Sequence, residues 1–404
     1  MQTIFLTCFH GYISRNLLQT NFFTFLSSRD DLRLVILVPK NKKEYFSRQF
    51  AGPSVIIEEV RFNTSSAGSF ASLLMKRIAK YALNTNSTRI ERLIKWKLDG
   101  KFFYFLALTL LAAVVSHSGL MRKLLRAVDY HLANKDHYAE LFLRYAPELV
   151  FATDMQNERD IEVLHNARKR NTRIFGMVRS WDNLTLHGLL RVLPDVLFVA
   201  SPRLKELAVT LHDIPTDRIE IVGIPYYDKY VKKSPVTKEV FFREIGLDPS
   251  KKTLFFAPTS DYYLRDNDAD PFMYEVLGKV KEQVIVRFSP SLEVASLKDA
   301  KPYPNMVIDR PDVNFRSASG ELTREDDDKL SNEIRFSDVV ICGPSSIALD
   351  ALVIGKPVIL TALHKKQKSY LEGINRRYDF DHFKFLLDCG AARIVKSEDE
   401  LRSI

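Results

Sequence analysis

The sequence predicts two consecutive α/β domains, each built around a parallel β-sheet. Short apolar runs rich in β-branched residues alternate with helical stretches along most of the chain, which is the pattern of βαβ units. With 404 residues, 46% of them hydrophobic, the chain is long enough for two ordinary domains and too apolar to be disordered. The pattern is interrupted at the polar stretch Asp228–Lys238, so we expect domains at residues 1–228 and 229–404.

In the first half, seven strand-like runs alternate with helical stretches. The predicted strands are Thr3–Thr7, Leu34–Val38, Val55–Val60, Leu149–Ala152, Arg173–Val178, Val196–Ala200 and Ile219–Val222. The predicted helices are Phe70–Leu83, Ile90–Leu98, Phe102–Val115, Glu158–Lys169 and Pro202–Leu211. An N-terminal Rossmann-like domain follows from this order, with a helical insertion at residues 70–126.

The second half repeats the alternation. The predicted strands are Thr253–Ala257, Gln283–Phe288, Met306–Ile308, Val339–Cys342 and Val358–Thr361. The predicted helices are Phe272–Lys281, Asp326–Phe336, Ile347–Ile354 and His382–Leu387. A further helix starts at Ser397 with an acidic first turn, but only Leu401 to Ile404 follow, so we expect a short, frayed last helix or a truncated chain.

The cysteines and the first residues point to the cytoplasm. Cys8, Cys342 and Cys389 lie far apart and form neither a disulfide framework nor a metal-binding pair, as is typical of a reducing compartment. Met1–Leu6 has no basic segment before its short apolar run, so we interpret it as a first β-strand and not as a secretory signal.

The positive charge is concentrated in the helical insertion. Residues 76–126 hold eleven Lys or Arg and two acidic residues, a net +9 that equals the net charge of the whole chain. The same region contains the apolar run Phe102–Val115, which is shorter than the roughly 20 residues that span a bilayer. Two interpretations stay open: peripheral docking on an anionic membrane face, or a buried helix with solvated basic neighbours. Nucleic-acid binding is not expected, because no known module accompanies the charge.

The most specific stretch runs from Asp338 to Ile359. An apolar strand leads into Gly343 and Pro344, and Ser345 and Ser346 then open a helix whose free backbone N–H groups are suited to a diphosphate. Asp350, one turn into this helix, is placed to accept hydrogen bonds from ribose hydroxyls. A structural helix capped by the two serines explains the same residues about as well.

This stretch resembles the C-domain signature of GT-B glycosyltransferases, in particular the group of CDP-glycerol glycerophosphotransferases, nonhydrolysing UDP-N-acetylglucosamine 2-epimerases and surface-polysaccharide glycosyltransferases. Phe255–Thr259, Val284–Pro290 and Gly176–Asn183 resemble further segments of that group, so the likeness covers most of residues 149–396. It implies two Rossmann-like domains that face each other across a cleft, with a nucleotide-activated donor in the C-domain and the acceptor in the N-domain.

The resemblance implies a set of donor-binding residues: Thr259, Arg287, Gly343, Pro344, Ser345, Ser346 and Asp350. Ser289 stands where the relatives commonly have His, so a phosphate contact there is absent or falls to Arg287. The epimerase signature His-Arg-Glu-Asn is missing after Pro258, where the chain continues with Thr259-Ser260-Asp261-Tyr262. An epimerase is therefore disfavoured.

In the first half, polar residues follow three predicted strands at the edge where a cleft would lie. His10 is the candidate general base, because imidazole titrates near neutrality. Asp154 or Asp182 can replace it in that role; otherwise they bind acceptor hydroxyls, together with Ser180 and Asn183. Loop capping is the structural alternative for these residues.

We expect no metal and no cofactor other than the nucleotide-activated substrate. Asp266-Asn267-Asp268-Ala269-Asp270 has the spacing of a metal site from a different transferase fold, but solvated acidic loops are commoner. Helix dipoles and Arg287 would stabilise a leaving diphosphate without a metal. Neither a Walker A loop nor Gly-x-Gly-x-x-Gly occurs, so an NTPase or dinucleotide oxidoreductase is not indicated.

Three functions stay open on this basis. The first is a metal-independent transferase that moves a sugar or polyol phosphate from a nucleotide-activated donor to a cell-surface glycan or lipid-linked acceptor, at the inner face of the membrane. The second is an isomerase that acts on a nucleotide sugar. The third is a noncatalytic carbohydrate-assembly protein that keeps the fold but not the chemistry.

Overall fold

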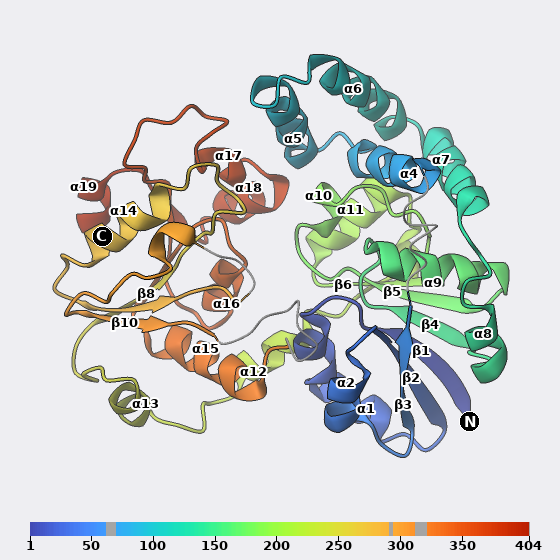
Figure 1. Cartoon of the computed structure of the whole chain (residues 1–404), viewed down its shortest axis with the longest axis horizontal. Helices are drawn as coiled ribbons and strands as arrows, with labels where there is room; N and C mark the ends of the chain where they lie inside the picture. Colours follow the sequence, from blue (N-terminus) through green and yellow to red (C-terminus); the bar gives the residue numbers. More distant parts are fainter. Residues whose placement is uncertain (62–69, 291–293, 312–320, 404) are drawn as a thin grey trace. The chain divides into compact units, whose positions relative to one another are not determined.

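The computed structural model describes residues 1–61, 70–290, 294–311 and 321–403 (Figure 1). The chain divides into two compact units, Met1–Tyr226 and Tyr227–Ile404. This division lies two residues before the boundary expected from the sequence.

Unit 1 contains a seven-stranded, fully parallel sheet in the order β3-β2-β1-β4-β5-β6-β7. The strands are β1 (Gln2–Thr7), β2 (Leu32–Pro39), β3 (Val55–Val60), β4 (Leu149–Ala152), β5 (Arg173–Met177), β6 (Val196–Val199) and β7 (Ile219–Ile221). All seven predicted strands are confirmed, with ends that shift by at most two residues.

The helices of unit 1 include the five that the sequence predicts and others that it does not. They are α1 (Asn21–Ser27), α2 (Lys43–Phe50), α4 (Phe70–Tyr81), α5 (Asn86–Lys97), α6 (Phe102–Ser116), α7 (Gly119–Leu132), α8 (Ala139–Tyr145), α9 (Glu158–Lys169), α10 (Asn183–Leu186) and α11 (Pro202–His212). Short turns of other helix types are η1 (Ser14–Leu18), η2 (Thr216–Arg218) and η3 (Pro225–Tyr227).

Helices cover both faces of this sheet, because its central strands are apolar on both sides. On one face, Phe5 of β1 packs edge-on against Phe142 of α8, with ring centroids 5.2 Å apart. On the opposite face, Leu6 belongs to a second apolar cluster that includes Leu17 of η1 and Phe46 of α2. The alternation of these neighbouring side chains fixes the register of the strand in the core.

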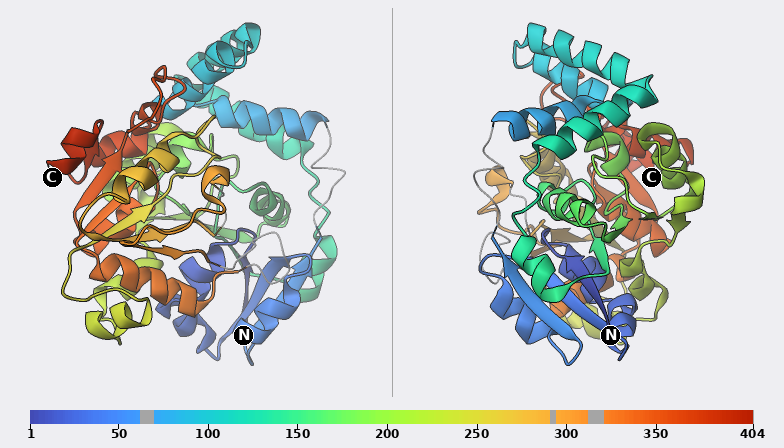
Figure 2. Two further views of the ribbon diagram at one scale, coloured as in Figure 1. Left: turned by 60° about the vertical axis from the view of Figure 1, so that its left-hand side comes forward. Right: turned by 90° about the vertical axis from the view of Figure 1, so that its right-hand side faces the viewer.

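Helices α4 to α7 form a group beyond α10 and α11, away from the sheet of unit 1 (Figures 1 and 2). Helix α6 contacts α4, α5 and α7, and α5 also contacts α10. In the described part of the chain, no single helix is long and apolar enough to cross a membrane; only α6 and α7 taken together, bent by 111°, reach the required length and composition.

The apolar residues of α6 and α7 lie partly inside and partly on the surface. Leu108, Ala112 and Val115 are buried against the neighbouring helices. The surface of these two helices also carries large apolar side chains: Phe102, Phe103, Leu106, Leu110, Val114, Leu120, Leu124, Val128 and Leu132. We call this set the apolar face of the insertion, which in the structure extends to the end of α7 at Leu132. The prediction of a buried helix is therefore correct for only one side of α6.

Ion pairs fasten α7 to the rest of unit 1. Arg122 and Arg126, both buried, pair with Asp213, and Arg126 also donates to the carbonyl oxygen of Leu190 at 2.9 Å. Asp213 ends α11 in a left-handed conformation with φ of 56°. One carboxylate thus joins the insertion to the sheet-covering helix α11.

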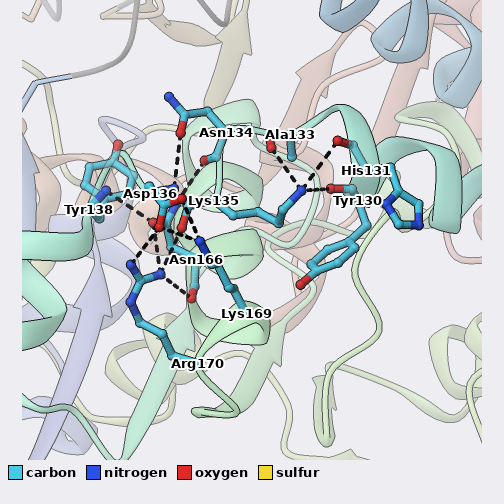
Figure 3. A network of polar contacts seen from close by, with 10 residues as sticks. All are labelled: Tyr130, His131, Ala133, Asn134, Lys135, Asp136, Tyr138, Asn166, Lys169 and Arg170. Carbon is cyan, nitrogen blue, oxygen red and sulfur yellow. Dashed lines mark hydrogen bonds and ion pairs between the residues drawn. The ribbon is translucent and has the colours of Figure 1, made fainter.

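The segment after α7 is held by polar contacts with α9, drawn in Figure 3. Lys135 donates to the carbonyl oxygen of Tyr130 at 2.8 Å, at the end of α7. Asp136 accepts from Lys169 at 2.6 Å, and Arg170 donates to the Lys135 carbonyl oxygen at 2.9 Å. These contacts satisfy the last carbonyl groups of α7 and direct the chain back towards β4.

A buried histidine makes the stability of unit 1 depend on pH. His212 is fully buried; its Nδ1 accepts from the Leu190 N–H at 3.1 Å, and its Nε2–H donates to the Leu184 carbonyl oxygen at 2.9 Å. Burial lowers the pKa of His212 to about 3. Because the unfolded chain has a His pKa of about 6.5, it binds more protons between these values, so stability must fall as the pH drops through that window.

We therefore expect His212 to cost about 2 kcal/mol of unfolding free energy between pH 7 and pH 5. Urea denaturation at both pH values measures this loss. In a His212→Gln variant, which keeps a donor and an acceptor, a loss of about that size should disappear. An unchanged pH dependence in the variant would refute the assignment.

Unit 2 contains a six-stranded parallel sheet in the order β10-β9-β8-β11-β12-β13. The strands are β8 (Thr253–Ala257), β9 (Gln283–Arg287), β10 (Met306–Asp309), β11 (Val339–Cys342), β12 (Val358–Thr361) and β13 (Arg393–Val395). The five predicted strands are confirmed, and β13 was not predicted.

The described helices of unit 2 include all four that the sequence predicts. They are α12 (Asp228–Val231), α13 (Lys238–Glu244), α14 (Ala269–Leu277), α15 (Arg324–Phe336), α16 (Ile347–Val353), α17 (Asn375–Tyr378), α18 (Asp381–Asp388) and α19 (Glu398–Arg402), with the short turn η4 (Ala295–Leu297). Ser397 caps α19 as predicted, accepting from the Glu400 N–H at 3.2 Å.

Candidate functional site

Each sheet has one position where the strand order reverses direction. In unit 1 the chain runs from β1 outwards to β3 and then returns to β4, so the reversal lies between β1 and β4. In unit 2 it lies between β8 and β11. In open α/β sheets, ligands bind outside the carboxyl ends of the strands at this switch point. His10 and Asp154 follow the two strands in unit 1, and Thr259 and Gly343 follow those in unit 2.

In unit 1, Asp154 is the centre of the polar group at the switch point. Its buried carboxylate accepts from Arg179 Nε at 2.7 Å and from Asn183 Nδ2 at 3.3 Å. Burial lowers the pKa of Arg179, but the charge and hydrogen bond of Asp154, together with the charge of Asp182, raise it overall. The structure thus brings together the loops that follow β4 and β5, as the sequence predicts.

His10 lies in the same polar group. Burial and the charge of Arg179 lower its pKa to about 4, against the opposing effect of Asp154. Its Nδ1 accepts from the Tyr12 N–H at 3.3 Å, which places the proton of the neutral ring on Nε2. In this form the ring can donate a hydrogen bond from Nε2. It is poorly placed to abstract a proton, because the Nδ1 lone pair already accepts from the Tyr12 N–H. His10 as general base stays a prediction.

Asp182 is the more accessible of the two candidate carboxylates. Its side chain is 22% exposed and lies 3.4 Å from His187 Nε2, whereas that of Asp154 is 6% exposed and paired with Arg179. Asp182 also starts α10, on which Asn183 is buried and Ser180, just before it, is half-buried. A carboxylate that water reaches is better placed to take a proton from an incoming hydroxyl group.

Sequence reasoning missed Asp160, which lies beneath this group. It is fully buried, and burial and the charge of Asp154 raise its pKa well above the usual value. Thr7 at the end of β1 hydrogen-bonds its carboxyl group. The available signal was helical spacing: Asp160 precedes Val163 and Leu164 by three and four residues on the buried face of α9.

In unit 2, Gly343 and Thr259 contact each other across the switch point. A Cβ atom at residue 343 would lie 1.7 Å from Thr259 Oγ1, so only glycine fits. Thr259 is buried, and its Oγ1 has no hydrogen-bond partner among the described residues. A buried hydroxyl without a partner is costly, which is characteristic of sites where a ligand supplies the partner.

The loop after β8 is held in an unusual conformation. Ser260 has a φ of 93°, which side-chain-bearing residues rarely adopt. The buried carboxylate of Asp270 accepts from the Thr259 and Ser260 N–H groups at 2.8 and 2.9 Å. Burial raises the pKa of Asp270, and these hydrogen bonds oppose that effect. The buried carboxylate of Asp270 thus fixes the backbone of the predicted donor loop.

The remaining residues of the predicted donor motif differ in exposure. Ser346 is exposed, Ser345 is half-buried and Pro344 is buried. Helix α16 has only seven residues, and its Asp350 is buried and accepts from the Tyr230 hydroxyl at 2.8 Å. Asp350 therefore ties α16 to α12, and its contact with a ribose stays a prediction.

Arg287 ends β9, as the sequence predicts, but its side chain pairs with acidic residues of the same unit. It is buried and pairs with Asp309, with Asp326 at 2.8 Å and with Glu333 at 3.5 Å. Burial opposes the charge of Arg287, yet these carboxylates raise its pKa. These ion pairs give the guanidinium a structural role. Its contact with a donor stays a prediction, and the donor site proposed below does not depend on it.

The acidic residues after Tyr263 differ in their main partners, although Lys368 lies near both Asp266 and Asp268. Asp266 pairs with Lys368 at 2.7 Å, Asp268 accepts from His364 at 2.8 Å, and Asp270 holds the loop after β8. Within residues 1–61, 70–290, 294–311 and 321–403, no three His, Cys, Asp or Glu side chains are arranged to hold a metal ion. Metal independence stays a prediction.

Comparison with known proteins finds a family match and structures of similar fold. The family model of CDP-glycerol:poly(glycerophosphate) glycerophosphotransferases matches residues 153–401. A search of curated proteins gives no significant match.

Solved structures share the fold at low sequence identity. The UDP-GlcNAc 2-epimerase from Neisseria meningitidis bound to UDP-GlcNAc is 10% identical with a TM-score of 0.54, over 99% of this chain and 89% of that one. UGT89C1 from Arabidopsis thaliana complexed with UDP-L-rhamnose is 9% identical with a TM-score of 0.53, over 99% and 87%. UDP-GlcNAc 2-epimerase from Methanocaldococcus jannaschii is 10% identical with a TM-score of 0.50, over 100% and 91%. These matches confirm the predicted fold class, two α/β domains of GT-B type.

Proposed function

The chain belongs to the CDP-glycerol:poly(glycerophosphate) glycerophosphotransferase family, and from this premise we propose that it transfers a sugar or a polyol phosphate from a nucleotide-activated donor to a glycan or lipid-linked acceptor. As a member of this family it is a transferase of the glycosyltransferase type. The donor lies in unit 2 and the acceptor in unit 1. The observation that supports the assignment is that His10 and Asp154 follow the two strands at the switch point of the unit 1 sheet, and that Thr259 and Gly343 do so in the unit 2 sheet.

In the proposed reaction, a hydroxyl oxygen of the acceptor attacks the anomeric carbon of a nucleotide sugar, or the phosphorus of a CDP-polyol. The bond to the nucleoside diphosphate, or to CMP in the second case, breaks as the new bond forms. Asp182 takes the proton of the acceptor hydroxyl, and His10 donates a hydrogen bond from Nε2 to a substrate oxygen. The donor motif from Gly343 to Ser346 and the Thr259 hydroxyl bind the phosphate groups that leave.

A screen of donors tests this function. Purified protein is heated with CDP-glycerol and with UDP-, GDP-, CDP- and dTDP-linked sugars; one nucleotide class should raise the melting temperature, because a ligand that binds only the folded state stabilises it. No shift with any of these compounds, combined with no turnover on any acceptor, would exclude a transferase. Turnover of a nucleotide sugar without an acceptor would instead favour the isomerase.

Replacing Thr259 by valine should separate donor binding from stability. Valine has the same shape and removes an unpaired buried hydroxyl, so the melting temperature should hold or rise. Affinity for the donor should fall about tenfold if Oγ1 binds it. Thr253→Val at the other end of β8 is the matched control and should leave the affinity unchanged. Equal affinities in all three proteins would remove Thr259 from the donor site.

We further propose that the insertion docks on the inner, anionic face of a membrane, where a lipid-linked acceptor lies. Of its eleven basic residues, Arg92, Arg122 and Arg126 are buried and two lysines pair with Glu91 and Asp99. Six exposed cations remain: Lys76, Arg77, Arg89, Lys97, Lys101 and Lys123. Together with the apolar face of the insertion they combine the two forces that hold peripheral helices on lipid.

Vesicle flotation tests the membrane contact. The protein should float with vesicles that contain phosphatidylglycerol, less with neutral vesicles, and less at high salt. Phe103→Ser should reduce flotation, because this ring is 83% exposed on α6. Leu143→Ser, at an 82% exposed position on α8 outside the insertion, is the control. Equal flotation of both variants and the wild type would exclude the apolar face as the contact.

A further inference from the structure

Arg376 is a buried cation that has no acidic partner in the part of the chain that the structure describes. Its side chain lies on α17 and the residue is 5% exposed. The guanidinium donates to the carbonyl oxygens of Gly373 at 2.7 Å and Tyr263 at 2.9 Å, and its Nε has no hydrogen-bond partner. Among the described residues no carboxylate pairs with it, whereas the buried Arg287 has three.

The surroundings of Arg376 are positively charged. Burial lowers its pKa to about 10, and the charges of Arg377 and Arg265 act in the same direction. Arg377 lies over the rings of Tyr263 and Phe380 at 5.0 and 4.9 Å. Leaving a buried positive charge without a counter-ion costs several kcal/mol, so such a cluster is expected where an anion binds.

Arg376 belongs to the carboxyl edge of the sheet, beside the switch point. Its partner Tyr263 lies in the loop after β8, the loop that carries Thr259, and the Tyr263 N–H donates to the Ser260 carbonyl oxygen at 3.3 Å. Two residues further on, the Tyr378 hydroxyl donates to the carbonyl oxygen of Thr361, the last residue of β12, at 2.6 Å. Strands β8 and β12 flank β11, whose loop carries Gly343.

We propose that Arg376, with Arg265 and Arg377, binds the phosphate groups of the nucleotide donor, the role that the sequence suggested for Arg287. The inference rests on the proposed function and names the cation of its donor site. The negative phosphates supply the counter-charge that none of the described carboxylates gives to Arg376. Arg265, which is exposed, contributes attraction through water, and Arg376 contributes direct hydrogen bonds.

Calorimetric binding of CDP, UDP, cytidine, uridine and inorganic pyrophosphate tests the proposal. In Arg376→Met, the affinity for the nucleoside diphosphate that the wild type binds should fall about 10- to 100-fold, while the affinity for its nucleoside stays unchanged. Arg335→Met is the matched control: Arg335 also bridges two carbonyl groups, of Tyr230 and Lys232, but at the opposite edge of the sheet, before β11. It should bind as the wild type does.

A second variant guards against misfolding of the first. Arg265→Gln changes an exposed side chain, should fold normally, and should weaken nucleoside diphosphate binding by about two- to fivefold, less at high salt. Unchanged affinity in folded Arg376→Met, or in Arg265→Gln where the first does not fold, overturns the inference and leaves the proposed function standing.

Failure of the proposed function has a different signature. If the wild type binds no nucleoside diphosphate and no donor, pyrophosphate decides. Pyrophosphate binding that Arg376→Met abolishes would keep the cluster as a phosphate site, and no pyrophosphate binding would overturn it.

Discussion

Arg287→Met is expected to lower the unfolding free energy by about 3–5 kcal/mol, the range found when one partner of a buried ion pair is removed. The substitution leaves the carboxylates of Asp309, Asp326 and Glu333 close together without their cation. Burial already raises the pKa of Glu333 well above its usual value, so this group takes up a proton first. Asp309 keeps its ion pair with Lys329, whereas Asp326 loses the guanidinium with which it pairs.

Urea denaturation of the variant measures the loss, and nucleotide binding to the folded fraction shows whether Arg287 also acts on the donor. We expect that binding to be unchanged. Arg287→Lys, which keeps the charge but not the forked geometry, should recover part of the stability. Normal stability with lost nucleotide binding would return Arg287 to the donor site.

Gly343→Ala is expected to destabilise unit 2 by about 3 kcal/mol and to abolish donor binding. The added Cβ would meet Oγ1, Cβ and Cγ2 of Thr259 at 1.7, 2.9 and 3.1 Å. Thr259 is buried and its N–H group is fixed by Asp270, so it cannot move aside without disturbing the loop after β8. A clash between residues 343 and 259 would therefore distort the loops after both β11 and β8.

A double-mutant cycle isolates this contact. Thr259→Gly removes all three atoms that the new Cβ meets, so Gly343→Ala should cost far less in that background. Gly52→Ala is the control, because a Cβ there meets nothing within 4 Å and should change little. A stable Gly343→Ala protein that still binds its donor would show that the two loops adapt.

Strands such as β1 and β8 were predictable because each is a short apolar run that is buried along most of its length. The same logic placed His10 beside Asp154, since the carboxyl ends of parallel strands share one edge. The sequence does not set α7 apart, because its basic and apolar residues continue the composition of the preceding helix. Its start is marked only by Ser118, which caps it by accepting from the Met121 N–H at 3.2 Å.

The partners of Arg287 could not be predicted, because they lie 22 to 46 residues away and no local pattern links them. Arg376 could not be predicted for a different reason. Nothing in its sequence neighbourhood marks it as buried, and an arginine without a carboxylate is visible only when the contacts of the fold are known. Electrostatic roles depend on tertiary neighbours, whereas strand and loop positions follow from periodicity.

The residues that attach α7 to α11 through Asp213 are different from those that form the exposed surface of the insertion. The buried arginines and their shared carboxylate set where the helices stand, and the apolar face of the insertion takes no part in that contact. Polar replacements on the exposed side of α6 and α7 would then change the chemistry of this surface while the helices keep their place. The exposed residues of the insertion can therefore change without loss of the fold, whereas Arg122, Arg126 and Asp213 cannot.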